Sequence, residues 1–353
     1  MKIGLISSSA PFVDGGYRFI AEWLNKVLIG YGYKSELIYI PFSNDDPETI
    51  FTQMTAFRLI NLEDRFDKVI TFRPPSHIVR HRDKTVWFIH HIRTFYDLWG
   101  TSYAPYNFND NNDNNYSGIR FIRKNLINAD GAALNEAKKV FSNSKIVAER
   151  LKKYNGIDSE VLYPPVLNPE RFFNDSYGDE IVCVCRIEEH KRQHLLAEAM
   201  KFVKSGVKLR LCGVGSDENY IKRIKKIIEE NNLKGKIYFE NRWITEEEKA
   251  IYFNNALASA YIPFDEDSYG YPTIESALSR KCAVTTIDAG GVTEFVIDGE
   301  CGLVVSNRPE DIAKAFDELM TKKNIARSLG ENSYLRVGEL KINWENIISK
   351  LIN

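Results

Sequence analysis

Of the 353 residues of the chain, 44% are hydrophobic and 27% charged, a composition that is ordinary for a globular protein. The chain is longer than one typical domain. Its formal net charge of -1 excludes the overall positive field of a nucleic-acid-binding protein. The five cysteines do not have the spacing of a metal-binding motif, and no apolar run approaches the ~18 residues of a membrane span. The start of the chain is strand-like and unlike a signal peptide. We therefore expect a cytoplasmic protein of two domains.

Strands and helices are expected to alternate in the first half of the chain, which is typical of a doubly wound parallel sheet. We expect strands over 2–7, 36–40, 68–72, 85–89, 139–141 and 160–163, with helices after Gly16, around 48–60, at 120–127 and at 145–154. Gly15 and Gly16 end the loop after the first strand, where the missing side chains would let the backbone approach a ligand closely. A simple tight turn explains these two glycines equally well.

A polar cluster follows the strand at 85–89 directly. It contains His90, His91, Arg93 and Asp97. Ligand groups in open α/β sheets collect at the carboxyl ends of the strands, so this cluster is well placed for function. A single histidine is more often structural, and for this pair the structural and functional explanations are evenly balanced.

The segment 101–118 is rich in Asn and Asp and predicts a long polar loop, which we interpret as a lid near an acceptor site. A calcium loop is excluded because Lys124 occupies the position that needs a bidentate Glu. The helices that follow, up to residue 153, carry more Lys and Arg than Asp and Glu. Such a surface can contact anionic lipid, although a solvated helix face is the commoner explanation.

A second doubly wound pattern begins at residue 180, after the prolines at 164, 165 and 169. Arg186 follows its first strand and Lys191 precedes the next helix, and two fixed cations at one crevice suit a diphosphate. A later strand leads into Gly213-x-Gly215, but Glu218 stands where a dinucleotide fingerprint has its third glycine. This departure disfavours an NAD(P) oxidoreductase.

The stretch 258–277 is read as a buried strand, an acidic loop and the start of a helix, with Pro272 as the first helical residue. The carboxylates of Asp267 and Glu275 bracket this turn. A helix start offers unpaired N–H groups and a positive dipole end, which favour phosphate or sugar hydroxyls. The plain alternative for Glu275 is a carboxylate that stabilises the helix dipole, worth roughly 0.3–1 kcal/mol.

These motifs together resemble the retaining GT-B glycosyltransferases of family 4, also called glycosyltransferase group 1. The resemblance is carried by Asp267-x7-Glu275 with Tyr269-Gly270-x-Pro272, by Asp288-x-Gly290-Gly291-x-x-Glu294, by Asp298-Gly299-x-x-Gly302-Leu303-Val304, and by Arg186 with Lys191. Weaker similarities in the first half extend it over nearly the whole chain.

The resemblance implies an α/β protein of two Rossmann-like domains that face a cleft. We place the acceptor-binding domain at 1–172, the nucleotide-sugar-binding domain at 173–336, and a C-terminal helix that packs back on the first domain at 337–353. The implied reaction transfers a hexose from a UDP- or GDP-sugar to a hydroxyl of a glycan, glycolipid or similar acceptor, with retention and without a protein nucleophile. No cofactor and no essential metal are expected, and Asp265-Glu266-Asp267 is interpreted as a coincidental DxD.

The resemblance also assigns roles to individual residues. The catalytic set is His90, Arg186, Lys191, Asp267 and Glu275; the donor-binding set is Gly15, Gly16, Gly213, Arg242, Tyr269, Gly270, Thr273 and Ile274; and the acceptor-side candidates are His91, Arg93 and Asp97. The family pattern has Glu at the position of Asp267, and because of this difference the resemblance does not specify the identity of the donor sugar. Two other functions fit a similar fold: a sugar-nucleotide epimerase and a non-catalytic nucleotide-sugar-binding protein.

Overall fold

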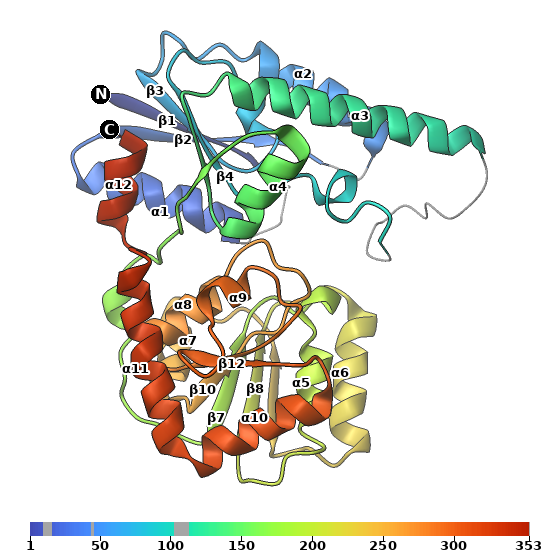
Figure 1. Cartoon of the computed structure of the whole chain (residues 1–353), viewed down its shortest axis with the longest axis vertical. Helices are drawn as coiled ribbons and strands as arrows, with labels where there is room; N and C mark the ends of the chain where they lie inside the picture. Colours follow the sequence, from blue (N-terminus) through green and yellow to red (C-terminus); the bar gives the residue numbers. More distant parts are fainter. Residues whose placement is uncertain (10–15, 44–45, 102–112, 353) are drawn as a thin grey trace. The chain divides into compact units, whose positions relative to one another are not determined.

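The computed structural model of the chain describes residues 1–9, 16–43, 46–101 and 113–352 (Figure 1). Contacts divide the chain into two compact units. Unit 1 consists of Met1–Pro164 and Asn343–Asn353, and unit 2 of Pro165–Ile342. Residues 165–172 and 337–342, which the sequence analysis had placed outside the second domain, therefore have their contacts within unit 2.

Unit 1 contains a six-stranded parallel sheet with the order β2-β1-β3-β4-β5-β6. The strands are β1 (Lys2–Ser9), β2 (Lys34–Pro41), β3 (Lys68–Thr71), β4 (Lys84–Phe88), β5 (Lys139–Ser142) and β6 (Glu160–Val161). All residues of β3 and β4 are buried, as expected for central strands that helices cover on both faces.

The helices of unit 1 are α1 (Gly16–Gly30), α2 (Ile50–Leu59), α3 (Asp113–Asn135), α4 (Lys145–Asn155) and α12 (Trp344–Ile352), with 3-10 turns η1 (Pro47–Thr49), η2 (Ser76–Ile78) and η3 (Arg93–Phe95). Because α3 begins at Asp113, the loop expected over 101–118 was wrong for its last six residues. The rest of the expected lid, 102–112, lies outside the described residues. The last helix, α12, packs against α1 and buries Ile347, Ile348 and Leu351 (Figure 1).

Unit 2 contains a second six-stranded parallel sheet, with the order β12-β11-β10-β7-β8-β9. The strands are β7 (Glu180–Val184), β8 (Lys208–Gly213), β9 (Ile237–Asn241), β10 (Ala258–Ala260), β11 (Ala283–Thr286) and β12 (Gly302–Val305). The helices are α5 (Gln193–Ala199), α6 (Glu218–Glu230), α7 (Glu246–Asn255), α8 (Tyr271–Leu278), α9 (Val292–Phe295), α10 (Pro309–Thr321) and α11 (Lys323–Glu339), with η4 (Pro169–Arg171) and η5 (Glu189–Lys191).

The strand order of unit 2 reverses between β7 and β10. From β7 the chain adds β8 and β9 on one side, and it then returns to β10 and adds β11 and β12 on the other. Ligands of open α/β sheets bind at such a switch point, outside the carboxyl ends of the strands. The loops that follow β7 and β10 are therefore the first place to look for a site.

Local sequence signals explain several helix ends. A capping box starts α7, where the side chains of Thr245 and Glu248 each accept a hydrogen bond from the other residue's backbone N–H. Gly156 ends α4 in the left-handed conformation that glycine adopts most easily. No helix in the described ranges combines the length and apolar character needed to cross a bilayer.

Candidate functional site

Lys191 joins the two loops at the switch point of unit 2. It ends η5, after β7, and its side chain is buried. Its Nζ donates a hydrogen bond to the Tyr261 hydroxyl at 2.8 Å and forms an ion pair with Glu266, both of which follow β10. The Tyr261 hydroxyl in turn donates to Glu266 Oε2 at 3.0 Å. The predicted cation therefore lies at the switch point, already engaged by a carboxylate.

The Lys191 ammonium stabilises the charged form of Glu266. Burial raises the pKa of Glu266, but the Lys191 ammonium outweighs that effect and brings the pKa to about 2. Burial, with the Glu266 charge in second place, raises the pKa of Tyr261 well above its ordinary value. At neutral pH the carboxylate is therefore ionised, and an arriving phosphate would share Lys191 with Glu266.

Arg192 is a structural residue that the sequence analysis missed. Its Nε donates to the Ile262 carbonyl at 2.7 Å and its Nη2 to the Pro263 carbonyl at 2.6 Å, just beyond β10. The same guanidinium binds both carboxylate oxygens of Asp288, which follows β11, at 2.7 and 2.8 Å. Arg192 thus ties together two loops at the carboxyl edge of the sheet. Its position beside the predicted Lys191 was the only available signal.

Arg186 lies at the end of the same β7 segment but is far more open than Lys191. Its side chain is 47% exposed, and Nη1 donates to Glu188 Oε1 at 2.5 Å. The neighbouring loop packs closely here, because a Cβ on Gly213, whose φ is +146°, would overlap the Cys185 carbonyl oxygen. A glycine is required at this position for packing, whatever its part in donor binding.

The segment from Asp265 to Gly270 is held against the turn at Gly290-Gly291. The Asp265 N–H donates to the Asp288 carbonyl at 2.9 Å, and the Gly291 N–H donates to the Glu266 carbonyl at 2.8 Å. A Cβ on Gly290 would lie 2.5 Å from the backbone N of Glu266. The glycine pair of the family-like motif therefore permits a close backbone contact between two loops.

Tyr269 and Gly270 shape the end of this segment. Tyr269 is buried, with its ring 6.2 Å from that of Phe295. Gly270 has a φ of +71°, and a Cβ there would overlap the Tyr261 ring, the same ring whose hydroxyl contacts Lys191. The turn before α8 is thus packed directly on the Lys191 site. Asp267, in the same segment, is half-buried.

The start of α8 differs in detail from the prediction. Gly270 is the N-cap and the helix begins at Tyr271, so Pro272 is its second residue and not its first. The Thr273 N–H, expected to face a phosphate, donates to the Gly270 carbonyl at 3.1 Å, and the Thr273 and Ile274 side chains are buried. Glu275 is 1% exposed, and its Oε1 accepts a 2.5 Å hydrogen bond from Lys249 Nζ. It is therefore half of a buried ion pair.

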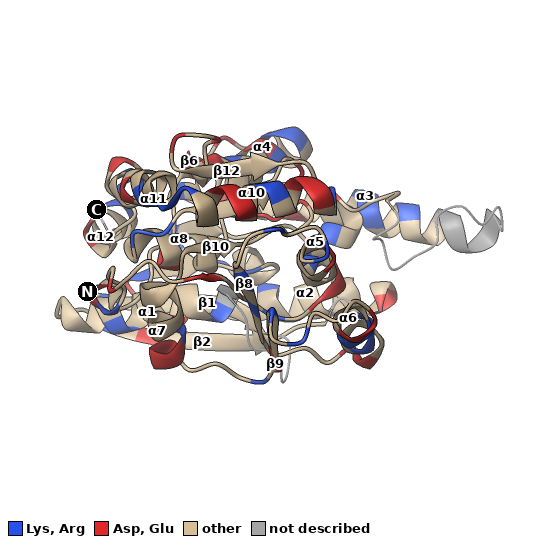
Figure 2. Cartoon of the chain, turned by 90° about the horizontal axis from the view of Figure 1, so that it is seen from below, with Lys and Arg blue, Asp and Glu red and all other residues tan. Residues whose placement is uncertain are grey.

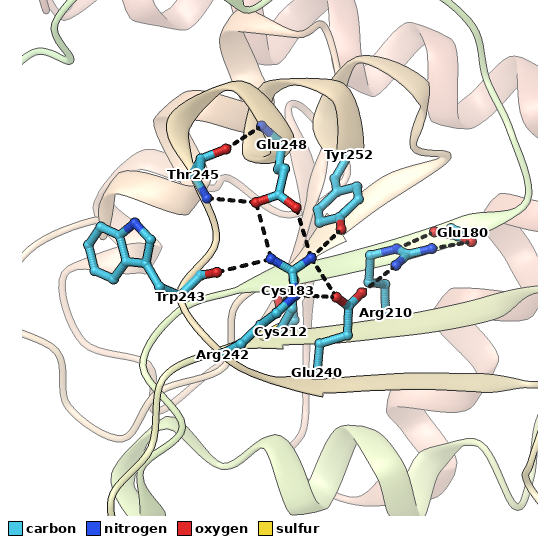
Figure 3. A network of polar contacts seen from close by, with 10 residues as sticks. All are labelled: Glu180, Cys183, Arg210, Cys212, Glu240, Arg242, Trp243, Thr245, Glu248 and Tyr252. Atoms are coloured by element: carbon cyan, nitrogen blue, oxygen red, sulfur yellow. Dashed lines mark hydrogen bonds and ion pairs between the residues drawn. The ribbon is translucent and has the colours of Figure 1, made fainter.

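Arg242 belongs to a network at the end of β9 (Figure 3). Its guanidinium binds Glu240 and, through both Nη atoms, the carboxylate of Glu248, at 2.8 to 3.1 Å. Its Nη1 also donates to the Trp243 carbonyl at 3.0 Å. Two carboxylates thus hold Arg242, whereas the adjacent Asn241 reaches the β8 loop and accepts from the Gly215 N–H at 2.8 Å.

In unit 1 the predicted histidines differ in burial and contacts. His90 is half-buried, its Nδ1–H donates to the His91 carbonyl at 2.6 Å, and burial together with the Arg73 charge lowers its pKa to about 4. His91 is buried, and its Nε2 lies 2.9 Å from Asn155 Oδ1. The centroid of its ring lies 4.1 Å from that of the Tyr96 ring. His91 is therefore part of the core of unit 1.

The other acceptor-side candidates pair with each other. Arg93 Nε donates to Asp97 Oδ2 at 2.7 Å, and Arg150 lies 3.5 Å from the same oxygen. Gly16 is the first residue of α1, and Gly15 lies outside the described residues. The roles assigned to all these residues remain predictions.

Each of the two units is a Rossmann-like α/β domain with a six-stranded parallel sheet, as in glycosyltransferases of the GT-B fold. Residues 169–336 match the model of the family described as Glycosyl transferases group 1. The match covers most of unit 2, including the Lys191 site, the Asp265–Gly270 segment and Glu275.

Two curated relatives resemble part of the chain. An uncharacterized glycosyltransferase of Methanocaldococcus jannaschii is 25% identical over 196 residues, which cover 55% of this chain and 50% of that protein. Alpha-1,3/1,6-mannosyltransferase ALG2 of Dictyostelium discoideum is 26% identical over 199 residues, 52% of this chain and 45% of that protein. The chain thus matches about half of the length of these relatives.

Solved structures resemble the whole chain. Sucrose-phosphate synthase from Thermosynechococcus elongatus has a TM-score of 0.77 and 18% identity, and the match covers 99% of this chain and 97% of that one. Anabaena HepE in complex with UDP has a TM-score of 0.70 and 14% identity, with 99% of both chains covered. At such identities the likeness establishes the fold.

Proposed function

We propose that this protein is a retaining glycosyltransferase of family 4 that transfers a hexose from a UDP- or GDP-sugar to a hydroxyl of a glycan, glycolipid or similar acceptor. The observation that carries the proposal is Lys191, a buried cation at the switch point of a unit that matches group 1 glycosyltransferases. The names of similar proteins point the same way: one relative is a mannosyltransferase, and HepE was solved with UDP and with UDP-glucose.

In this proposal Lys191 and Arg186 bind the donor diphosphate. As the glycosidic C–O bond breaks, negative charge grows on the leaving phosphate, and fixed cations stabilise that charge most in the transition state. Arg186, which is more exposed, can turn from Glu188 toward the ligand, whereas Lys191 is held in place by Tyr261. No metal is required for this neutralisation, and we propose none.

The remaining donor contacts follow from the family resemblance. Asp267 would orient hexose hydroxyls, Glu275 would bind ribose hydroxyls, and the loop at Asn241 and Arg242 would contact the base. From unit 1, His90 would contact the donor sugar or phosphate as a neutral imidazole, because its pKa of about 4 leaves it uncharged at pH 7. The acceptor would attack from the side of the leaving group, which gives retention without a protein nucleophile.

The test is a panel of UDP-, GDP- and ADP-sugars in a thermal-shift assay, because a ligand that binds the folded protein raises its melting temperature. The stabilising donor is then incubated with candidate acceptors, and the anomeric configuration of the product is read by NMR. Transfer with retention supports the proposal. Donor conversion without an acceptor would indicate an epimerase, and binding without any reaction would indicate a non-catalytic binding protein.

Contact with a membrane surface is part of the same proposal. Both α3 and α4 carry exposed basic residues (Figure 2), and the ring of Phe121 on α3 is also exposed, a composition that binds anionic lipid surfaces. Co-sedimentation with vesicles of anionic and of neutral lipid tests it, with salt as a second variable. Equal binding to both vesicle types would contradict it.

A further inference from the structure

A buried ion pair joins α7 to α8. Glu275 lies on α8 and is 1% exposed, while Lys249 lies on α7 and is 9% exposed. Lys249 Nζ donates to Glu275 Oε1 at 2.5 Å and to Glu246 Oε1 at 2.8 Å. The ammonium thus has two carboxylate partners, of which Glu246 is the more exposed.

The second oxygen of Glu275 has no such partner. Oε2 is buried and accepts no hydrogen bond from the residues that the structure describes. Buried carboxylate oxygens are normally hydrogen-bonded, because leaving one unpaired keeps the full cost of removing it from water. A buried acceptor without a donor points to a ligand that supplies one. A sugar hydroxyl is such a donor.

Lys249 also affects the charge of this carboxylate. Burial holds the pKa of Glu275 above its ordinary value, and the Lys249 ammonium opposes that shift and favours the ionised form. An ionised carboxylate accepts hydrogen bonds at both oxygens, and a hydrogen bond to it is about twice as strong as one between neutral groups. With Oε1 fixed by Lys249, the rotation of the carboxylate is fixed as well, and so is the direction of Oε2.

We propose that Lys249 is a positioning residue for nucleotide recognition: it holds Glu275 so that Oε2 accepts a hydrogen bond from a ribose hydroxyl of the donor. This inference rests on the proposed function, which brings a nucleotide to Glu275. Lys249 itself touches no substrate. Its predicted effect is a preference for ribonucleotides over deoxyribonucleotides.

Melting temperatures alone cannot test this role. Removing one partner of a buried ion pair destabilises a protein strongly whether or not the pair serves a ligand. A ratio of two affinities measured on the same variant removes that effect, because any loss of stability is common to both ligands. We define the ribose preference as the Kd of the 2′-deoxy or 3′-deoxy nucleoside diphosphate, whichever is larger, divided by the Kd of the ribonucleotide.

The experiment uses the full chain and isothermal titration calorimetry with UDP, GDP and ADP and their 2′-deoxy and 3′-deoxy counterparts. The variants are Glu275→Gln, Lys249→Met and the matched control Glu246→Gln, which removes the negative charge of the ammonium's other partner. Since a hydrogen bond to a charged group contributes about 1.5–3 kcal/mol, the wild-type preference should be on the order of 10- to 100-fold for the diphosphate that binds best.

The inference expects Lys249→Met and Glu275→Gln to lower this preference to about the same small value, and Glu246→Gln to retain it. A Lys249→Met variant that keeps the wild-type preference overturns the inference while leaving the proposed function intact. Failure of the wild-type protein to bind any of the three ribonucleotides overturns the proposed function and the inference with it.

Lys249→Met leaves a buried carboxylate with no donor and could fail to fold. Lys249→Gln is the second variant, because its amide can donate to a carboxylate without carrying a charge. Its preference should also fall, and retention of the full wild-type preference in this variant would overturn the proposed role of the ammonium.

Discussion

Lys191 is the residue on which the proposed reaction depends most. Lys191→Met should lower kcat/KM for transfer by on the order of 10²–10³, by analogy with the loss of one preorganised oxyanion donor. Steady-state kinetics with the donor found in the panel measure this change. Lys201→Met, at an exposed lysine in the same unit, is the matched control and should leave the rate unchanged.

A loss of structure would also lower the rate of Lys191→Met, because that variant leaves the half-buried Glu266 without its ion-pair partner. The double variant Lys191→Met/Glu266→Gln removes both charges and should recover much of the stability. Its transfer rate should stay low. A double variant with near wild-type transfer would show that Lys191 acts only by compensating Glu266.

The Lys191–Glu266 pair also predicts a pH dependence of stability. The pKa of Glu266 falls from 4.5 to about 2 on folding, so its contribution is complete above pH 4.5 and is lost as the pH falls toward 2. Urea titrations at several pH values should therefore show wild type more stable than Glu266→Gln at pH 7, with a difference that shrinks below pH 4.5. A difference independent of pH over that range would contradict this origin.

At the scale of elements, the turn before α8 is constrained by packing as well as by backbone conformation. Gly270 and Gly299 have nearly the same φ, +71° and +68°, but a Cβ on Gly270 would overlap the Tyr261 ring, whereas a Cβ on Gly299 has nothing within 4 Å. Gly299→Ala should cost about 1 kcal/mol for the positive φ. Gly270→Ala should cost at least about 1–3 kcal/mol more, because of the overlap and because its ψ of 132° lies outside the left-handed helical region. Urea unfolding measures both. Equal losses would mean that Tyr261 moves aside freely.

A glycine in a sequence motif can be required for packing or for ligand binding, and the sequence alone does not distinguish the two. Gly213 and Gly290 each permit a close approach between two loops, and Gly270 permits a close approach to the Tyr261 ring in its own loop. Each of the three also lies in a motif that resembles a donor site. Packing alone can account for these glycines, so their presence supports the fold more strongly than it supports ligand binding.

At the scale of the whole molecule, the last helix belongs to the first unit. Leu351 of α12 is fully buried in unit 1, whereas Lys350 is 44% exposed and pairs with Glu160 at 2.7 Å. Leu351→Ala should destabilise unit 1 by about 2–5 kcal/mol, and Lys350→Ala by about 0–1 kcal/mol. Hydrogen exchange resolved by mass spectrometry should show the loss of protection in unit 1. A loss confined to unit 2 would contradict this assignment.

The sequence by itself determined the class of fold and the order of the elements. Buried parallel strands read as short apolar runs, and turns and caps depend on adjacent residues, so signals such as the Thr245–Glu248 capping box are visible without a structure. It also indicated which segments would meet, because Arg186, Lys191 and the 262–270 segment follow strands that the topology places side by side.

The tertiary structure alone decided what those side chains contact. Glu266 was interpreted as part of a coincidental DxD, and in the structure it is the partner of Lys191. Glu275 was expected to be a catalytic carboxylate at a helix start, and in the structure it is paired with Lys249 on another helix. Arg192 is not part of any recognised motif, yet it links the loop after β10 to the loop after β11. Such partners lie 26 to 96 residues apart along the chain, and a sequence pattern reports only local neighbours. Whether a charge is free, paired or buried is therefore set by the folded chain.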